Sequence, residues 1–131
     1  MKKFLFFCFT VFCLLSNVSN ASTIDINKAY QSKQSDIQVE GIGKVIKVLK
    51  DDTKGSRHQK FLLKLSSNLT ILVAHNIDLS RRVAGINVGD TIEFYGEYEW
   101  NNKGGVIHWT HHDPRKKHKD GWLKHNGIIY Q

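Results

Sequence analysis

The sequence predicts a mainly β protein, and three observations about its pattern point to this class. Apolar and polar residues alternate over five segments of about six to twelve residues, as in strands that are buried on one face. Residues that favour turns cluster between those segments. One stretch that could be helical lies between the third and fourth segments. This order predicts a small five-stranded Greek-key barrel, OB-like (oligonucleotide/oligosaccharide-binding), with one short helix between strands three and four.

The first predicted strand covers residues 38–49 and is rich in β-branched residues. Gly41 and Gly43 interrupt it and suggest a bend or bulge, which a strand shared between the two sheets of a barrel would need. The polar run 51–55 ends in glycine and predicts a turn. The second strand, residues 58–65, follows this turn and alternates strictly between apolar and polar positions.

The remaining strands are predicted in the same way. The third covers residues 69–74, and residues 76–83 then form a short helix or an ordered loop. The fourth covers residues 91–100, and the sequence Asn-Asn-Lys-Gly-Gly at 101–105 is the strongest hairpin signal in the chain. We therefore expect the fifth strand, residues 106–111, to return antiparallel to the fourth and to lead into a C-terminal tail rich in His and Trp.

Residues 1–21 have the pattern of a secretory signal peptide, with two lysines, an apolar run and small residues at the end. The apolar run is about twelve residues, shorter than the roughly 20 that a membrane-spanning helix needs. We therefore expect cleavage after Ala21, no stable membrane anchor, and a secreted or periplasmic protein. Residues 22–36 are predicted as a polar lead, mobile or with one short helix, and residues 37–131 as a single OB-like domain.

Cleavage would also change the chemistry that is available. Cys8 and Cys13 would leave with the signal peptide, so the mature chain could use neither a disulfide nor a cysteine nucleophile. Loss of Lys2 and Lys3 would lower the formal net charge from +7 to +5. This positive charge favours an anionic partner such as nucleic acid, an anionic polysaccharide or lipid head groups.

Histidines are concentrated in the tail, and they are the main candidates for chemistry. Five of the seven lie in the last 24 residues, interleaved with tryptophans. A Glu beside a His is a general acid–base pair, although it can equally be a hydrogen bond that only holds two strands together. Pairing of the fourth strand with the fifth, and of the second with the third, should bring such groups together. The candidate catalytic residues are His58, His75, Glu97, Glu99, His108 and His111.

A divalent metal is a further option for the tail. His111, His112, Asp113 and His118 are sufficient in number and type to hold one. Their spacing matches no zinc motif, because neither HExxH nor CxxC occurs. The sequence therefore permits a metal site without specifying one.

Basic and aromatic side chains could contact an anionic polymer, by pairing with phosphates and by stacking on bases or sugar rings. The alternative is that the tryptophans pack in the core and that the basic tail is a solvated loop. The candidate ligand-binding residues are Arg57, Arg82, Trp100, Trp109, Arg115 and Lys116.

Several longer motifs resemble one bacterial family, domain-of-unknown-function family 3465. The resemblance covers roughly residues 39–130 and implies a small secreted, barrel-like domain, but it supplies no activity. The motifs that carry it are Arg57-His58-Gln59-x-Phe61, Ala74-His75-Asn76-Ile77-Asp78-Leu79, Gly96-Glu97-Tyr98-Glu99-Trp100-Asn101, Gly104-Gly105-Val106-x-His108-Trp109-Thr110-His111-His112-Asp113-Pro114, Gly121-Trp122 and His125-x-Gly127.

The sequence leaves three functional hypotheses. The favoured one is binding of an anionic polymer such as nucleic acid through a cleft of His, Arg and aromatic residues. The alternative is a small phosphodiester hydrolase, nuclease-like, that uses His and Glu as acid and base, with or without a metal. The third is a structural domain whose tail only seals the barrel. The density of ionisable groups argues against the third hypothesis.

Overall fold

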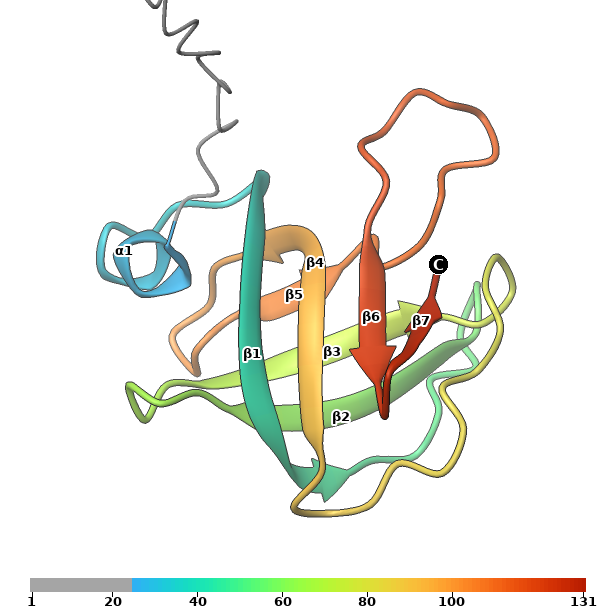
Figure 1. The fold of residues 1–131 in the computed structure, drawn as a ribbon. Coiled ribbons are helices and arrows are strands. Elements are labelled where there is room, and N and C mark those ends of the chain that lie inside the picture. Colours follow the sequence, from blue (N-terminus) through green and yellow to red (C-terminus); the bar gives the residue numbers. More distant parts are fainter. Residues whose placement is uncertain (1–24) are drawn as a thin grey trace, which may run out of the picture.

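The computed structural model describes residues 25–131, so the predicted signal peptide lies outside the described residues. One short helix and seven strands make up the described part (Figure 1). Their bounds are α1 Ile26–Gln31, β1 Ile37–Val48, β2 His58–Lys64, β3 Thr70–Asn76, β4 Thr91–Glu99, β5 Val106–His108, β6 Trp122–His125 and β7 Ile128–Tyr130. No helix in this part of the chain is long and apolar enough to cross a membrane.

The first five strands close into a barrel. Strand β1 pairs antiparallel with both β2 and β4, and β2 pairs antiparallel with β3. Strand β5 closes the circle, because it pairs parallel with β3 and antiparallel with β4. In Figure 1, β1 and β4 run side by side across β2 and β3. The predicted five-stranded barrel is therefore confirmed, and the structure shows it closed.

Strand β1 serves both halves of the barrel, as its glycines suggested. It pairs with β4 up to Lys44 and with β2 from Lys44 onward, and its register with β2 shifts between Val45 and Lys47. The irregularity thus lies beyond the glycines. Gly41 is required for a different reason, because a Cβ there would come within 2.5 Å of the Phe94 ring. Close packing inside the barrel explains this glycine.

The core lies inside the barrel and follows the predicted alternation. Buried side chains alternate along β2, β3 and β4, and each fully buried large apolar residue contributes about 1.5–3 kcal/mol to stability. The opposite faces of these strands carry the polar residues that reach the outer surface. The largest fully buried apolar side chains are Tyr98, Phe61, Phe94, Leu63, Ile71, Ile92, Ile107 and Leu123.

The short helix expected between strands three and four is absent from the described structure, and the ordered loop, the other alternative for residues 76–83, is the one observed. The Asn76 side chain accepts the backbone N–H groups of Asp78 and Leu79, which holds this segment as a turn and not as a helix. The helix lies before the barrel, where Asp25 caps α1 by accepting the N–H of Asn27. Ile26 and Ala29 of α1 are buried in the core. The helical alternative for the polar lead is therefore the one observed.

The hairpin between the fourth and fifth strands is confirmed. Asn101 Oδ1 accepts the backbone N–H groups of Lys103 and Gly105, at 2.9 Å each. Gly104 and Gly105 have φ values of 123° and 96°, which side-chain-bearing residues rarely adopt. The turn returns the chain so that Glu97 lies opposite a residue of β5.

The tail differs from the prediction in two ways. The fifth strand ends at His108 and not at residue 111, because Trp109 has a φ of 56° and leaves the extended conformation. The tail also contains β6 and β7, which no sequence pattern had indicated. Strand β6 pairs with the first half of β4, and Leu123 completes the core there. The β5–β6 loop, residues 109–121, connects these two neighbours of β4.

Candidate functional site

Two adjoining cavities lie on the outer surface, where the β5–β6 loop meets the ends of β2, β3 and β5. The smaller, which we call the imidazole cavity, has a volume of about 220 Å³. The larger, which we call the basic groove, has a volume of about 480 Å³. The imidazole cavity is lined by Ser56, His58, Asn76, Leu79, His108, Trp109 and His111. The basic groove is lined by Leu79, Trp109, Asp113, Pro114, Arg115, Lys117 and His118.

Backbone carbonyls orient two of the imidazoles in the smaller cavity. His58 Nδ1 lies 2.9 Å from the carbonyl oxygen of Ser56, and His111 Nδ1 lies 2.7 Å from that of His112. A carbonyl can only accept, so each Nδ1 carries a proton and donates it. In the neutral ring, Nε2 then holds the lone pair. Both rings are therefore set to take up a proton at Nε2, or to donate one from it when charged.

His108 stands beside two carboxylates, as the predicted strand pairing requires. Glu97 lies directly opposite His108 across β4 and β5. His108 Nε2 is 3.6 Å from Glu99 Oε2 and 4.0 Å from Glu97 Oε2. This nitrogen is buried and makes no hydrogen bond within the described residues. The expected Glu–His neighbours are thus present at one edge of the imidazole cavity.

His118 forms the closest of these pairs. Its Nε2 lies 2.5 Å from Glu97 Oε2, and its Nδ1 lies 2.8 Å from the carbonyl oxygen of Lys119. Both ring nitrogens of His118 are thus engaged, one by a carboxylate and one by a backbone carbonyl. The ring stacks on Trp109, with 4.0 Å between centroids and 9° between planes. Glu97 therefore holds His118, and His118 supports the indole of Trp109.

Trp109 is the wall common to the two cavities. Its φ of 56° is exceptional for a bulky residue, and such backbone strain is frequent at functional sites. This turn is possible because Gly121 has no side chain, so the backbone at Trp109 can lie directly against it. A Cβ at Gly121 would overlap the carbonyl oxygen of Trp109 and would come within 2.5 Å of that of Tyr95. The strained residue thus places a half-buried indole between the imidazoles and the basic side chains.

Carboxylates shape the rest of the loop. Asp113 accepts the backbone N–H groups of Arg115, Lys117 and His118, at 2.7 to 3.0 Å. These donors, Arg115 first, hold the pKa of Asp113 below its usual value. Asp120 accepts the Asp113 N–H, which is the main reason for its own lowered pKa. Arg115 and Lys117 are therefore held at the basic groove by an ordered turn.

The predicted metal ligands are not brought together. His112 Nδ1 pairs with Asp120 Oδ2 at 3.0 Å, His118 pairs with Glu97, and the Asp113 carboxylate is occupied by backbone donors. Across residues 25–131 no group of three or more His, Cys, Asp or Glu is arranged to hold a metal ion. The side chains that could have bound a metal ion are instead engaged in hydrogen bonds, either within the loop or to Glu97 of β4.

His75 lies inside the barrel, beneath the cavity and not in its lining. Its Nδ1 is 2.7 Å from the Thr110 hydroxyl, and its Nε2 is 3.0 Å from the Arg81 carbonyl oxygen. Burial lowers the pKa of His75 to about 4, so the ring stays neutral. This candidate catalytic residue instead ties β3 to the start of the β5–β6 loop.

The candidate ligand-binding residues are divided by the fold. Arg57 pairs with Asp78 and Arg82 pairs with Asp51, both at the surface. Trp100 stacks on Tyr30 of α1, and its Nε1 donates to the Tyr30 carbonyl oxygen. None of these three, nor Lys116, lines the basic groove, whereas Trp109 and Arg115 do.

Sequence reasoning missed several lining residues. Leu79 is 47% exposed and lies in both cavities, but an isolated leucine in a turn gives no signal of its own. Lys117 belongs to the basic tail, for which the sequence offered a solvated loop as the alternative. Asn76 enters through the β2–β3 pairing, in which it lies opposite His58, and Ser56 lies just before β2, where its carbonyl contacts the His58 ring. That pairing was predicted, and it could have pointed to Asn76.

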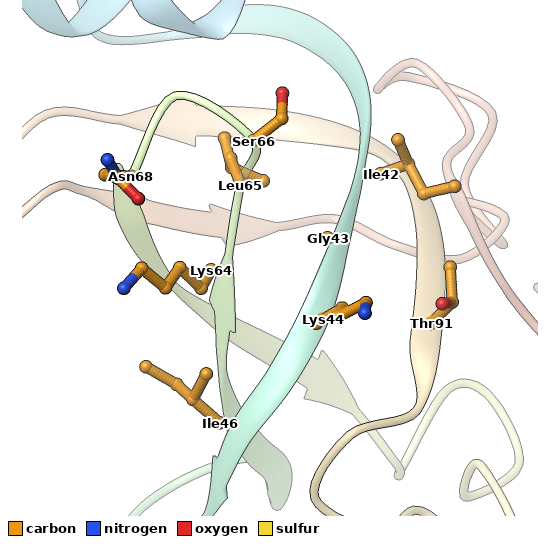
Figure 2. A pocket seen from close by; sticks show the side chains of 9 residues that line it. All are labelled: Ile42, Gly43, Lys44, Ile46, Lys64, Leu65, Ser66, Asn68 and Thr91. Atoms are coloured by element: carbon orange, nitrogen blue, oxygen red, sulfur yellow. The ribbon is translucent and has the colours of Figure 1, made fainter.

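A separate groove of about 460 Å³ lies on the outer side of β1 (Figure 2). Ile42, Ile46 and Leu65 supply its apolar surface, and Lys44 and Lys64 supply its positive charge. None of the candidate site residues lines it. This β1 groove offers a comparison site with two lysines at a different place on the barrel.

Comparison with known proteins assigns the chain to a family. No match was found among the curated proteins. A family model described as protein of unknown function (DUF3465) matches residues 8–131, which is nearly the whole chain and includes every residue of both cavities. The resemblance seen in the motifs is confirmed, and the chain belongs to the DUF3465 family.

Proposed function

We propose that the protein binds a single-stranded nucleic acid, the form of anionic polymer that best suits the imidazole cavity and the basic groove. The observation that carries this proposal is the position of Trp109, whose indole is a wall of both. An aromatic ring between an imidazole-lined hollow and basic side chains can stack on a base while the neighbouring phosphates meet positive charge.

The basic groove has the features that a nucleoside requires. Its volume of about 480 Å³ falls in the range of sites for small organic groups. Leu79 and Pro114 add apolar surface beside Trp109, while Arg115 and Lys117 bring positive charge. Arginine can also bind a phosphate through two parallel hydrogen bonds. A base or sugar ring would therefore lie against Trp109, with a phosphate at the basic side chains.

The imidazole cavity is smaller, at about 220 Å³, and suits a phosphate more than a base. Protonated Nε2 atoms of His58 and His111 would donate hydrogen bonds to phosphate oxygens. The formal net charge of +7 for the full sequence favours approach of a polyanion. The two cavities thus fit successive parts of one strand.

Hydrolysis of a phosphodiester is the second candidate function. It is favoured by one specific observation: three imidazoles line a single cavity, and the carboxylates of Glu97 and Glu99 stand beside one of them. Positioned imidazoles and carboxylates are the usual groups of general acid–base catalysis. Binding alone does not require so many titratable groups around one small hollow.

Fluorescence anisotropy with a labelled 12-nucleotide single-stranded DNA tests the binding proposal. The affinity should fall steeply with added salt, with a logarithmic slope of about −0.7 for each phosphate contacted. Replacing both Arg115 and Lys117 by alanine should make that slope shallower and weaken binding at least tenfold. The matched control replaces Lys44 and Lys64, which removes the same charge from the β1 groove, and should leave binding within about twofold.

Three results would count against the proposal. Binding that does not depend on salt would exclude a phosphate-contacting site. An equal loss in the two double variants would show that net charge matters and the basic groove does not. Tighter binding of an anionic polysaccharide than of the oligonucleotide, measured by competition, would identify a different polymer as the ligand.

A further inference from the structure

We infer that the imidazole cavity cleaves RNA, with His58 and His111 transferring the protons and the ribose 2′-hydroxyl of the substrate acting as nucleophile. This inference rests on the proposed binding of a single-stranded nucleic acid and names the substrate class and the reaction. It starts from the orientation of two rings. In each, a backbone carbonyl holds the proton on Nδ1, and Nε2 is left to exchange protons with a bound molecule.

The two rings come from distant parts of the chain but line one cavity. His58 begins β2, while His111 lies in the β5–β6 loop and is 2% exposed. A cavity of about 220 Å³ with two such rings can hold one phosphodiester between a proton acceptor and a proton donor.

Cleavage of RNA needs little more than this pair. The 2′-oxygen bonds to phosphorus while its proton passes to Nε2 of the neutral ring. The bond from phosphorus to the 5′-oxygen breaks as the other ring, protonated, gives its Nε2 proton to that oxygen. The products are a 2′,3′-cyclic phosphate and a 5′-hydroxyl. No water is consumed, and solvent restores the two protonation states.

The nucleophile follows from what the cavity contains. Ser56 carries the only side-chain hydroxyl among the lining residues, and its carbonyl is committed to orienting His58. The 2′-hydroxyl, by contrast, is tethered next to the phosphorus that it attacks, and such proximity alone gives a large rate advantage. DNA lacks this group. A strand stacked on Trp109 would therefore be bound as DNA or RNA but cut only as RNA.

A chimeric oligonucleotide provides the test. The probe is a DNA strand with one ribonucleotide between a fluorophore and a quencher, compared with the all-DNA strand and with the same strand carrying a 2′-O-methyl ribonucleotide. We expect cleavage of the first probe alone. Mass spectrometry should find a 2′,3′-cyclic phosphate, which is lighter by one water than the hydrolysed product. All three probes should bind with affinities within about threefold.

Asparagine variants connect the activity to the two rings. His58→Asn and His111→Asn keep a side-chain N–H that can donate to the same carbonyl but cannot transfer a proton. Each should reduce cleavage of the ribonucleotide probe at least 100-fold, by far more than the loss of one phosphate contact weakens binding of the all-DNA probe. Imidazole added to His58→Ala should restore part of the rate. The two asparagine variants, purified identically, control for contaminating nucleases, and the Lys44/Lys64 double variant should cleave normally.

The outcomes separate the two proposals. Binding of all three probes without cleavage would overturn this inference and leave the proposed binding function intact. Cleavage of all three probes, or direct formation of a linear phosphate, would overturn the role of the 2′-hydroxyl. Unchanged cleavage by His58→Asn would overturn the proton-transfer pair, even if His111→Asn failed to fold. Absence of both binding and cleavage would reject the proposed function as well.

Discussion

The imidazole of His118 lies flat against the indole of Trp109, with 4.0 Å between ring centroids and 9° between planes. Trp109 belongs to the stretch predicted as a strand, and His118 is nine residues further along the chain. The stack joins the two ends of the β5–β6 loop above Glu97 of β4. The wall between the two cavities therefore depends on a contact between two residues nine positions apart in the chain, and this contact forms only in the folded loop.

Replacing Glu97 by Gln should weaken this arrangement. A hydrogen bond to a charged group contributes about 1.5–3 kcal/mol, and the Glu97 carboxylate is shielded from water, with its side chain 14% exposed. We expect Glu97→Gln to lower the free energy of unfolding by about 1–2 kcal/mol and to change the Trp fluorescence. Glu93→Gln is the matched control on the same face of β4, because its partner Lys124 forms an exposed pair worth at most about 1 kcal/mol. Equal effects of the two substitutions would contradict the prediction.

The buried neutral His75 should make stability depend on pH. Its pKa falls from the ordinary 6.5 to about 4 in the folded protein, mainly because of burial. In the unfolded chain His75 binds a proton below pH 6.5, whereas in the folded protein it does so only below about pH 4. The contribution of the neutral ring to the free energy of unfolding is therefore complete above pH 6.5. It is lost as the pH falls from 6.5 to 4. The full loss amounts to about 3 kcal/mol.

His75→Gln isolates this contribution. Glutamine can still donate to the Arg81 carbonyl oxygen but does not titrate. We expect the variant to be less stable at pH 7 and to lose less stability than the parent between pH 6.5 and 4. Urea unfolding at pH 7, 5.5 and 4.5 measures both proteins. Parallel pH dependence in the two would show that other groups dominate.

Asp113→Asn should loosen the turn that presents the basic groove. The neutral amide is a weaker acceptor than the carboxylate, which now receives three backbone N–H groups. We expect faster hydrogen exchange at the amides of Arg115, Lys117 and His118, together with weaker oligonucleotide binding. Asp36→Asn, at an exposed position outside the loop, serves as control and should change neither. Unchanged exchange in the Asp113 variant would reject the proposed role of its carboxylate.

Gly121→Ala should disrupt the same loop through sterics alone. The added methyl group would overlap the Trp109 carbonyl oxygen and crowd that of Tyr95, and backbone atoms cannot move aside as a side chain can. Overpacking of this kind typically costs about 1–3 kcal/mol, sometimes more. Thermal unfolding should show a lower midpoint. Gly127→Ala is the comparison, because no atom of residues 25–131 lies within 4 Å of the position of its Cβ, although its φ of 77° adds backbone strain. A smaller loss at Gly121 than at Gly127 would contradict the steric argument.

Much of the barrel could be predicted because its signals are local. The strict alternation of apolar and polar residues predicted β2, and the Asn-Asn-Lys-Gly-Gly turn predicted the β4–β5 hairpin. The pairing of Glu97 with His108 follows from that hairpin. The shared first strand was expected as well. These features depend on side-chain period and turn chemistry, and both can be read over a few residues.

The tail could not be predicted in this way. Trp109 has a positive φ, which a bulky residue rarely adopts, and its backbone packs against Gly121. For this reason the strand predicted for residues 106–111 ends at His108. Strand β6 is only four residues long and pairs with a strand that is remote in sequence. The groups offered as metal ligands instead accept or donate hydrogen bonds within the loop.

The sequence by itself determined the five-stranded barrel, because repeated alternation leaves only one face of each strand to bury. It also determined the supply of imidazoles, carboxylates and basic side chains in the tail. Only the tertiary structure decided which of them meet: His58 and His111 at one cavity, His118 on Glu97, and His75 in the interior. The physical reason is that hydrogen bonds and close packing across the loop act between residues far apart in the chain, and no local pattern records such contacts.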